Sequence, residues 1–153
     1  MKPKYISYKK ALERAMYICS KAEKCKFDIR KKLYDWKSKP DHHEKIIAEL
    51  MKQKYIDENR YTNYYVRDKF KFNKWGKIKI RSMLFQKHLP EKIINEAIKQ
   101  IDDEEYLEML KNVINQKLKS LKEKDPNKQK SKLIRFATSR GFEPSLILTI
   151  IGN

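Results

Sequence analysis

Glycine is scarce in this sequence, and this scarcity narrows the range of folds and functions that the chain can have. Only three of the 153 residues are glycine. That is too few for the Gly-rich loop with which many enzymes cradle the phosphates of a nucleotide. It also argues against a β-rich fold with its tight turns and suits helices joined by short connections. The composition therefore favours an all-α protein without a nucleotide-binding loop.

Cysteine and long apolar runs are lacking as well. Cys19 and Cys25 are spaced too widely for a helical metal site and have no His nearby, so we predict neither a metal site nor a disulfide framework. No segment approaches the ~20 apolar residues of a membrane span, and the N-terminus has no apolar stretch of signal-peptide length. We expect a cytoplasmic, monomeric protein that needs no cofactor and does not enter a membrane.

Groups that could form an active site are equally hard to assemble. The acidic cluster at 102–105 lies at a predicted helix N-terminus, where carboxylates complement the helix dipole. His42 and His43 are adjacent, and adjacent residues of a helix point about 100° apart, so the two rings do not readily share a metal. No Ser–His or Cys–His pair has a positional argument behind it. We therefore expect a protein that is not an enzyme.

Positive charge is what the sequence has in excess. Lys and Arg number 37 against 20 Asp and Glu, which gives a net charge of +17. Residues 1–57 carry 16 basic and 8 acidic groups, residues 58–101 carry 11 and 4, and residues 102–153 carry 10 and 8. The excess favours an anionic partner, with nucleic acid first, an acidic protein surface second and an anionic membrane third. The alternative explanation is a lysine-rich composition typical of an AT-rich genome.

Two patterns recur along the chain. The segments 56–61 and 101–106 both consist of Ile-Asp, three residues and Tyr, and each Asp is a good N-cap for a following helix. An apolar pair that is followed three residues later by a second apolar pair occurs three times. Each occurrence comes after a proline: Pro40, Pro90 and Pro144. Such self-similarity is typical of tandem repeats.

The apolar positions recur at three- and four-residue steps, which is the spacing of amphipathic helices. We predict an all-α fold of three tandem three-helix repeats at 7–56, 57–101 and 102–151. A three-helix unit of this size has a small core, so the units should stack on one another. The result would be an elongated, curved array rather than a ball.

The most basic segment, RDKFKFNKWGKIKIR at residues 67–81, is predicted to be a corner between two helices. Gly76 is expected to take a positive φ there and end the first helix. Trp75 is expected to pack against the corner, with stacking on a base as the alternative. The predicted partner-binding or DNA-binding residues are Arg60, Arg67, Lys69, Lys71, Lys74, Trp75, Lys77, Lys79 and Arg81. We expect reversal of Lys74, Lys77, Lys79 and Arg81 to Glu to abolish binding and leave the fold intact, because all four are predicted to lie outside the core.

The run IDENRYTNYYVRDKFKFNKWGKIKIRSML at 56–84 resembles the signature of the RecX regulatory proteins. It has their acidic joint with an Arg, then an aromatic helix, a glycine, and a basic helix that ends in an apolar pair. The resemblance covers about residues 8–151. The structural motif positions are Asp57, Tyr61, Gly76, Leu84, Asp102 and Gly141. The family's glycine after the middle helix is retained only as Gly141, with Lys37 and His88 at the corresponding turns.

The resemblance implies tandem three-helix units that bind the RecA recombinase filament on single-stranded DNA. It further implies restraint of filament growth, ATP hydrolysis and strand exchange. Some members of the family also contact DNA, so single-stranded or double-stranded DNA is a second expected partner. Two alternatives stay open: a stand-alone basic DNA- or RNA-binding module, and a helical scaffold for an acidic protein without nucleic acid.

Overall fold

The computed structural model describes residues 4–152, and this part of the chain forms nine α-helices in three groups of three. The helices are α1 (Tyr8–Lys21), α2 (Lys26–Asp35), α3 (Pro40–Lys52), α4 (Glu58–Lys71), α5 (Lys77–Gln86), α6 (Glu91–Lys99), α7 (Asp103–Ser120), α8 (Pro126–Ser139) and α9 (Pro144–Ile151). The predicted all-α fold is confirmed. No helix in this part of the chain is long and apolar enough to cross a membrane.

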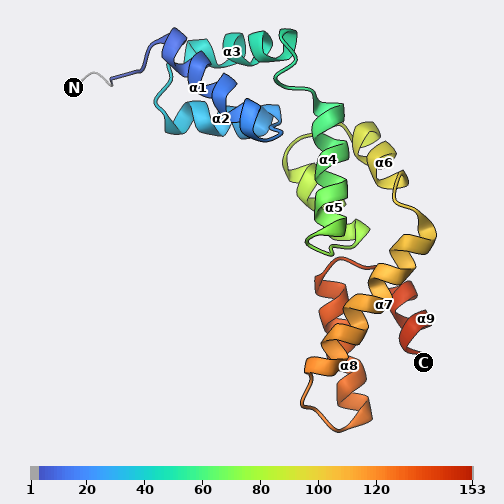
Figure 1. The fold of residues 1–153 in the computed structure, drawn as a ribbon. Coiled ribbons are helices and arrows are strands. Elements are labelled where there is room, and N and C mark those ends of the chain that lie inside the picture. The colour runs from blue at the N-terminus through green and yellow to red at the C-terminus, as the bar shows by residue number, and fades with distance from the viewer. Residues whose placement is uncertain (1–3, 153) are drawn as a thin grey trace.

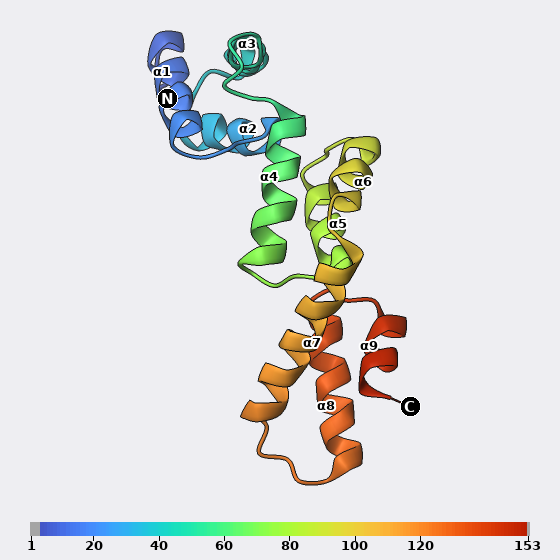
Figure 2. The ribbon, with the colours of Figure 1, turned by 45° about the vertical axis from the view of Figure 1, so that its right-hand side comes forward.

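The three groups follow one another as tiers of an elongated, bent molecule (Figure 1). Every extensive helix–helix contact among residues 4–152 lies within one group: α1–α3, α4–α6 or α7–α9. A second view shows the same separation, with the last tier farthest from the first (Figure 2). The predicted array of three tandem three-helix repeats is therefore confirmed. The boundaries 7–56, 57–101 and 102–151 stay a prediction, and we use them below to name the first, second and third repeats.

The joint pattern Ile-Asp-x₃-Tyr begins α4 and α7 in the same way. An Asp57 carboxylate oxygen accepts the Arg60 backbone N–H at 3.0 Å, and Asp102 accepts the Glu105 backbone N–H at 3.0 Å. Both caps satisfy a backbone donor that the helix leaves free. The Ile and Tyr of each joint are buried. The sequence pattern thus combines a helix cap with two apolar anchors.

The middle helix of each repeat ends in the same turn, although only one of the three turns has a glycine. Lys37, His88 and Gly141 have φ values of 59°, 59° and 95°. These values lie in the left-handed region, which costs a side-chain-bearing residue about 1–2 kcal/mol. The departures from the family's glycine at Lys37 and His88 therefore leave the sense of the turn unchanged.

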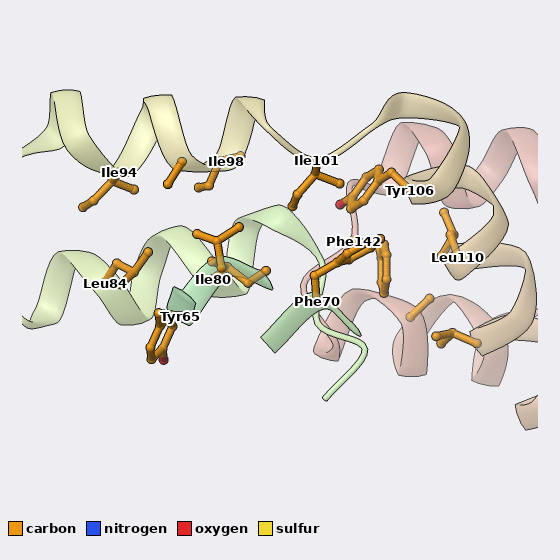
Figure 3. Close-up of a cluster of buried hydrophobic side chains, with 14 of the residues drawn as sticks. Tyr65, Phe70, Ile80, Leu84, Ile94, Ile98, Ile101, Tyr106, Leu110 and Phe142 are labelled. Atoms are coloured by element: carbon orange, nitrogen blue, oxygen red, sulfur yellow. The ribbon is translucent and has the colours of Figure 1, made fainter. Parts of the chain in front are cut away.

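The apolar cores divide the molecule unevenly. The first repeat has a core of its own, built from Ala11, Ala15, Ile29, Leu33, Ile46, Ile47, Leu50 and Ile56. The second and third repeats share one continuous core (Figure 3). At their boundary the ring centroids of Phe70 and Tyr106 lie 5.8 Å apart, and those of Tyr106 and Phe142 lie 5.3 Å apart.

The expectation of a positive φ at Gly76 is wrong. Its φ is −79°, and it caps the N-terminus of α5. The left-handed residue of this corner is Lys74, with φ 58°. Glycine is required at 76 for a different reason: a Cβ there would lie 2.3 Å from the carbonyl of Gly141. The two backbones are in direct contact, since the Gly76 N–H donates to the Arg140 carbonyl at 2.7 Å.

Candidate interaction surfaces

Trp75 lies half-buried at the corner between α4 and α5 and packs against the shared core. Two cations approach its ring, with Lys69 Nζ 5.2 Å and Lys79 Nζ 4.5 Å from the centroid. A cation over the face of an indole is attracted by the negative face of the ring. Lys69, Trp75 and Lys79 therefore form one cluster, in which the Trp has the structural role predicted for it.

Lys77 is turned toward the third repeat instead of the solvent. Its backbone N–H donates to the Tyr106 hydroxyl at 2.9 Å, and its Nζ lies 4.6 Å from the centroid of the same ring. The Tyr106 hydroxyl in turn donates to a Glu143 carboxylate oxygen. Burial and this hydrogen bond raise the pKa of Tyr106 above its ordinary value, so the hydroxyl keeps its proton. Lys77 thus belongs to the joint between the second and third repeats.

Lys74 and Arg81 reach in different directions. Lys74 Nζ donates to the Gln116 side-chain oxygen of α7 at 3.1 Å, and Arg81 Nε donates to the Asn95 side-chain oxygen of α6 at 3.3 Å. None of Lys74, Lys77, Lys79 and Arg81 lies in an apolar core, as predicted, but each contacts another side chain. Lys74, Lys77 and Lys79 are half-buried. Reversing their charge would remove contacts that hold the corner together.

Arg60 lies at the joint between the first and second repeats. Its Nε donates to a Glu23 carboxylate oxygen at 2.6 Å, and its Nη2 donates to the Lys54 carbonyl at 3.1 Å. This side chain, predicted to bind a partner, thus ties the end of the first repeat to α4. It stays 44% exposed, so a partner can still reach it.

Arg67 and Lys71 are exposed and line a cavity of about 170 Å³ together with Gln100 and Glu105. The cavity lies beside α6 and the start of α7, away from Trp75. The nine predicted residues therefore do not form one row of cations. They divide between the Trp75 cluster, the two joints and this separate cationic pair.

Sequence reasoning missed the residues that join the first repeat to the second. Lys87 Nζ donates to an Asp28 carboxylate oxygen at 2.7 Å, across 59 positions of the chain. Burial would raise the pKa of Asp28, but the hydrogen bond and charge of Lys87 outweigh it and hold the pKa below its ordinary value. No short-range pattern marks such a pair, because its two members come from α2 and the turn after α5.

Aromatic side chains surround this ion pair. Lys87 Nζ lies 5.6 Å from the Tyr61 ring centroid and 5.9 Å from that of Tyr65. Burial raises the pKa of Tyr65 to about 12, and it raises the pKa of the Cys25 thiol to about 11. Cys25 is fully buried and is the only first-repeat residue placed in the shared core. The tyrosines and the thiol therefore stay protonated at neutral pH.

In the described ranges no three His, Cys, Asp or Glu side chains come together as a metal site.

Models of known protein families match two of the three repeats. The family model for the second three-helix domain of RecX matches residues 57–98, and the model for the third three-helix domain matches residues 103–151. A "Regulatory protein RecX" of Clostridium acetobutylicum is 30% identical over 145 residues, which are 92% of this chain and 67% of the relative. This chain belongs to the RecX family of regulatory proteins.

Other RecX proteins extend the likeness. One from Clostridium botulinum is 34% identical over 109 residues, 70% of this chain and 50% of its own length. The chain thus spans between half and two thirds of these two relatives. A crystal structure of regulatory protein RecX is 26% identical with a TM-score of 0.85, covering 94% of this chain and 72% of that one. RecX from Lactobacillus salivarius shares the fold, with a TM-score of 0.78 at 20% identity over 94% of both chains.

Proposed function

We propose that this chain binds the RecA recombinase filament on single-stranded DNA and inhibits its growth, its ATP hydrolysis and strand exchange. The observation that carries the proposal is membership in the RecX family of regulatory proteins, with two consecutive RecX domains matched along the chain. The protein acts by binding alone. The shape supports a filament as the partner, because a long, bent array of repeats offers contacts along many subunits.

The charge distribution supports the same proposal. Residues 1–57 have a net charge of +8 and residues 58–101 of +7, whereas residues 102–153 have only +2. A filament on DNA is a polyanion to which the first two repeats are drawn electrostatically. Arg67, Lys71 and Arg81 are the cations of the predicted set that are exposed and outside the joints and the Trp75 cluster. We assign the contact with the filament to them.

The test is ATP hydrolysis by RecA on single-stranded DNA, measured with increasing amounts of the purified protein. Inhibition at or below about one molecule per RecA subunit is expected. The variant R67E/K71E/R81E should lose this inhibition and keep its helical circular dichroism. A matched variant, K9E/K45E/K52E, reverses three exposed lysines of the first repeat and should still inhibit.

Two outcomes would overturn the proposal. The first is unchanged ATP hydrolysis at equimolar protein. The second is capture of naked DNA as tightly as of the RecA filament at physiological salt, which would identify a stand-alone nucleic-acid-binding module. If both charge-reversal variants lost inhibition alike, the contact assigned to Arg67, Lys71 and Arg81 would be refuted. The proposal that the chain binds the filament would still stand.

A further inference from the structure

The third repeat has little net charge, yet its structure contains a groove lined by cations. Two adjoining hollows of about 320 and 370 Å³ lie between α7 and α8 and share Lys117 and Phe136. Their cationic lining residues are Lys74, Lys117, Lys132, Arg135 and Arg140. No Asp or Glu lines either hollow among the described residues, although Lys132 Nζ lies 3.9 Å from a Glu123 carboxylate oxygen. We propose that this α7–α8 groove binds the sugar-phosphate backbone of a single-stranded nucleic acid.

Phe136 positions two of these cations. Lys117 Nζ lies 4.8 Å and the Arg140 guanidinium carbon 5.0 Å from the centroid of its ring. Attraction to the ring holds both side chains over the groove, so less side-chain freedom is lost when they meet an anion. The Arg140 guanidinium also donates to the Asn73 carbonyl at 3.2 Å, which fixes it from the second repeat. The cations are therefore preorganised.

Most acidic groups of the third repeat lie at its other end, with Glu123 beside Lys132 as an exception. Of the eight acidic residues after residue 101, five lie between 102 and 108, at the start of α7. Glu104 and Lys117 are 13 positions apart on one helix, roughly 20 Å at 1.5 Å per residue. That is about twice the distance over which salt screens charges at 0.1 M. The small net charge of this repeat thus conceals an acidic end and a cationic groove.

The width of the groove favours a single strand over a duplex. Packed helix axes lie about 8–10 Å apart, and α7 and α8 pack directly on each other. A single extended strand can lie within such a groove, whereas a duplex would contact only its edges. Uniform cations without carboxylates suit a chain of phosphates, and single-strand-binding proteins track the backbone through grooves of this kind. This inference does not rest on RecA binding, since the groove lies apart from Arg67, Lys71 and Arg81.

The experiment measures binding of a fluorescent oligothymidylate of about 20 nucleotides by anisotropy, without RecA, over a series of salt concentrations. The variant K117A/K132A/R135A should weaken binding about tenfold or more at low salt. It should also lower the slope of log affinity against log salt by about 2, since each phosphate contact contributes roughly 0.7. The matched variant K122A/K124A/K128A removes three exposed cations of the same repeat outside the groove, and its affinity should stay within about twofold.

A second variant, F136L, keeps an apolar side chain against the core while removing the ring that positions Lys117 and Arg140. It should weaken binding about threefold at unchanged helicity. Equal losses in the groove variant and its matched variant would overturn the proposal. So would tighter binding of a duplex of the same length, or displacement of the oligonucleotide by poly-glutamate at equal charge, which would indicate an acidic protein partner. Because RecA is absent, these outcomes are independent of the ATP-hydrolysis test.

Discussion

The joint between the first and second repeats and the joint between the second and third are built from different interactions. At the first joint three ion pairs cross: Asp28–Lys87, Glu23–Arg60 and Lys26–Glu58, with nitrogen–oxygen distances of 2.7, 2.6 and 3.6 Å. At the second joint the two cores merge, and the backbones of Gly76 and Gly141 touch. Partly exposed ion pairs contribute about 1 kcal/mol or less each and weaken with salt, whereas apolar burial and buried hydrogen bonds do not.

This difference indicates a molecule with one rigid pair of repeats and one adjustable repeat. The second and third repeats should unfold together, because one core spans both. The first repeat has its own core, and apart from Cys25 in the shared core it is held to α4 and the end of α5 mainly by charges. The predictions below test this contrast, in order of decreasing expected effect.

The largest effect is expected from Gly76→Ala. Its new Cβ would lie 2.3 Å from backbone atoms of Gly141, and neither backbone can yield without separating the two repeats. We expect a loss of about 3 kcal/mol in the free energy of unfolding, measured by urea denaturation. Gly152→Ala is the control, because Gly152 has φ 86° with no atom near its Cβ position, so it isolates backbone strain of about 1 kcal/mol. Equal losses in the two variants would contradict the steric explanation.

Tyr106→Phe should cost less. It removes the hydroxyl that accepts the Lys77 N–H and donates to Glu143. Both groups then lose a hydrogen-bond partner at a buried joint. A loss of about 1–2 kcal/mol is expected in the same urea experiment. Tyr64→Phe removes a hydroxyl from a side chain that is 51% exposed and should be nearly neutral. If the Tyr106 variant were as stable as the Tyr64 variant, the hydroxyl would not stabilise the joint.

Asp28→Asn should loosen the first joint only. Hydrogen exchange of the segment 24–30 should accelerate, while exchange in α7 and α8 stays unchanged, for a local cost of about 1 kcal/mol. Raising the salt concentration from about 0.05 M to about 0.5 M should reproduce this effect in the unaltered protein. Glu44→Gln breaks an ion pair with Arg30 that lies wholly within the first repeat, with side chains 45% and 70% exposed, and should leave segment 24–30 protected. Faster exchange across α7 and α8 in the Asp28 variant would show that the joints are not independent.

The smallest effect is a dependence on pH. The pKa of Asp28 is lowered in the folded protein, so its ion pair stabilises the fold above the ordinary carboxyl pKa of about 4. This contribution is lost as the pH falls through the folded-state pKa. The stability difference between the unaltered protein and Asp28→Asn should therefore shrink from about pH 5 to about pH 3. A difference that grows over this interval would mean that the carboxylate destabilises the joint.

Much of the fold could be predicted because its signals are local. Three- and four-residue apolar spacing marks the helices, and Asp57 and Asp102 mark two of their N-termini. The repeated joint pattern led directly to the tandem repeats. The conformation of Gly76 was predicted incorrectly. A glycine after a basic helix looks the same in sequence whether the backbone requires a positive φ there or another backbone packs against it. Only Gly141, 65 positions away, decides between the two.

The candidate site was predicted less well than the fold. The residue types at 67–81 are those of a basic corner, but their directions depend on neighbours distant in sequence. Tyr106 draws Lys77 inward, Gln116 draws Lys74 toward α7, and Trp75 gathers Lys69 and Lys79. The α7–α8 groove has no local signature at all, because its lining comes from both partners of a helix pair.

The sequence by itself determined which segments are helical, where they begin, how they repeat and that the surface is basic. These properties follow from backbone hydrogen bonding and apolar spacing within a few residues of each other. Only the tertiary structure decided which cations are free to meet a partner and which hold a joint. A lysine side chain is long enough to serve either role, and the choice depends on carboxylates and rings that the fold brings from other helices.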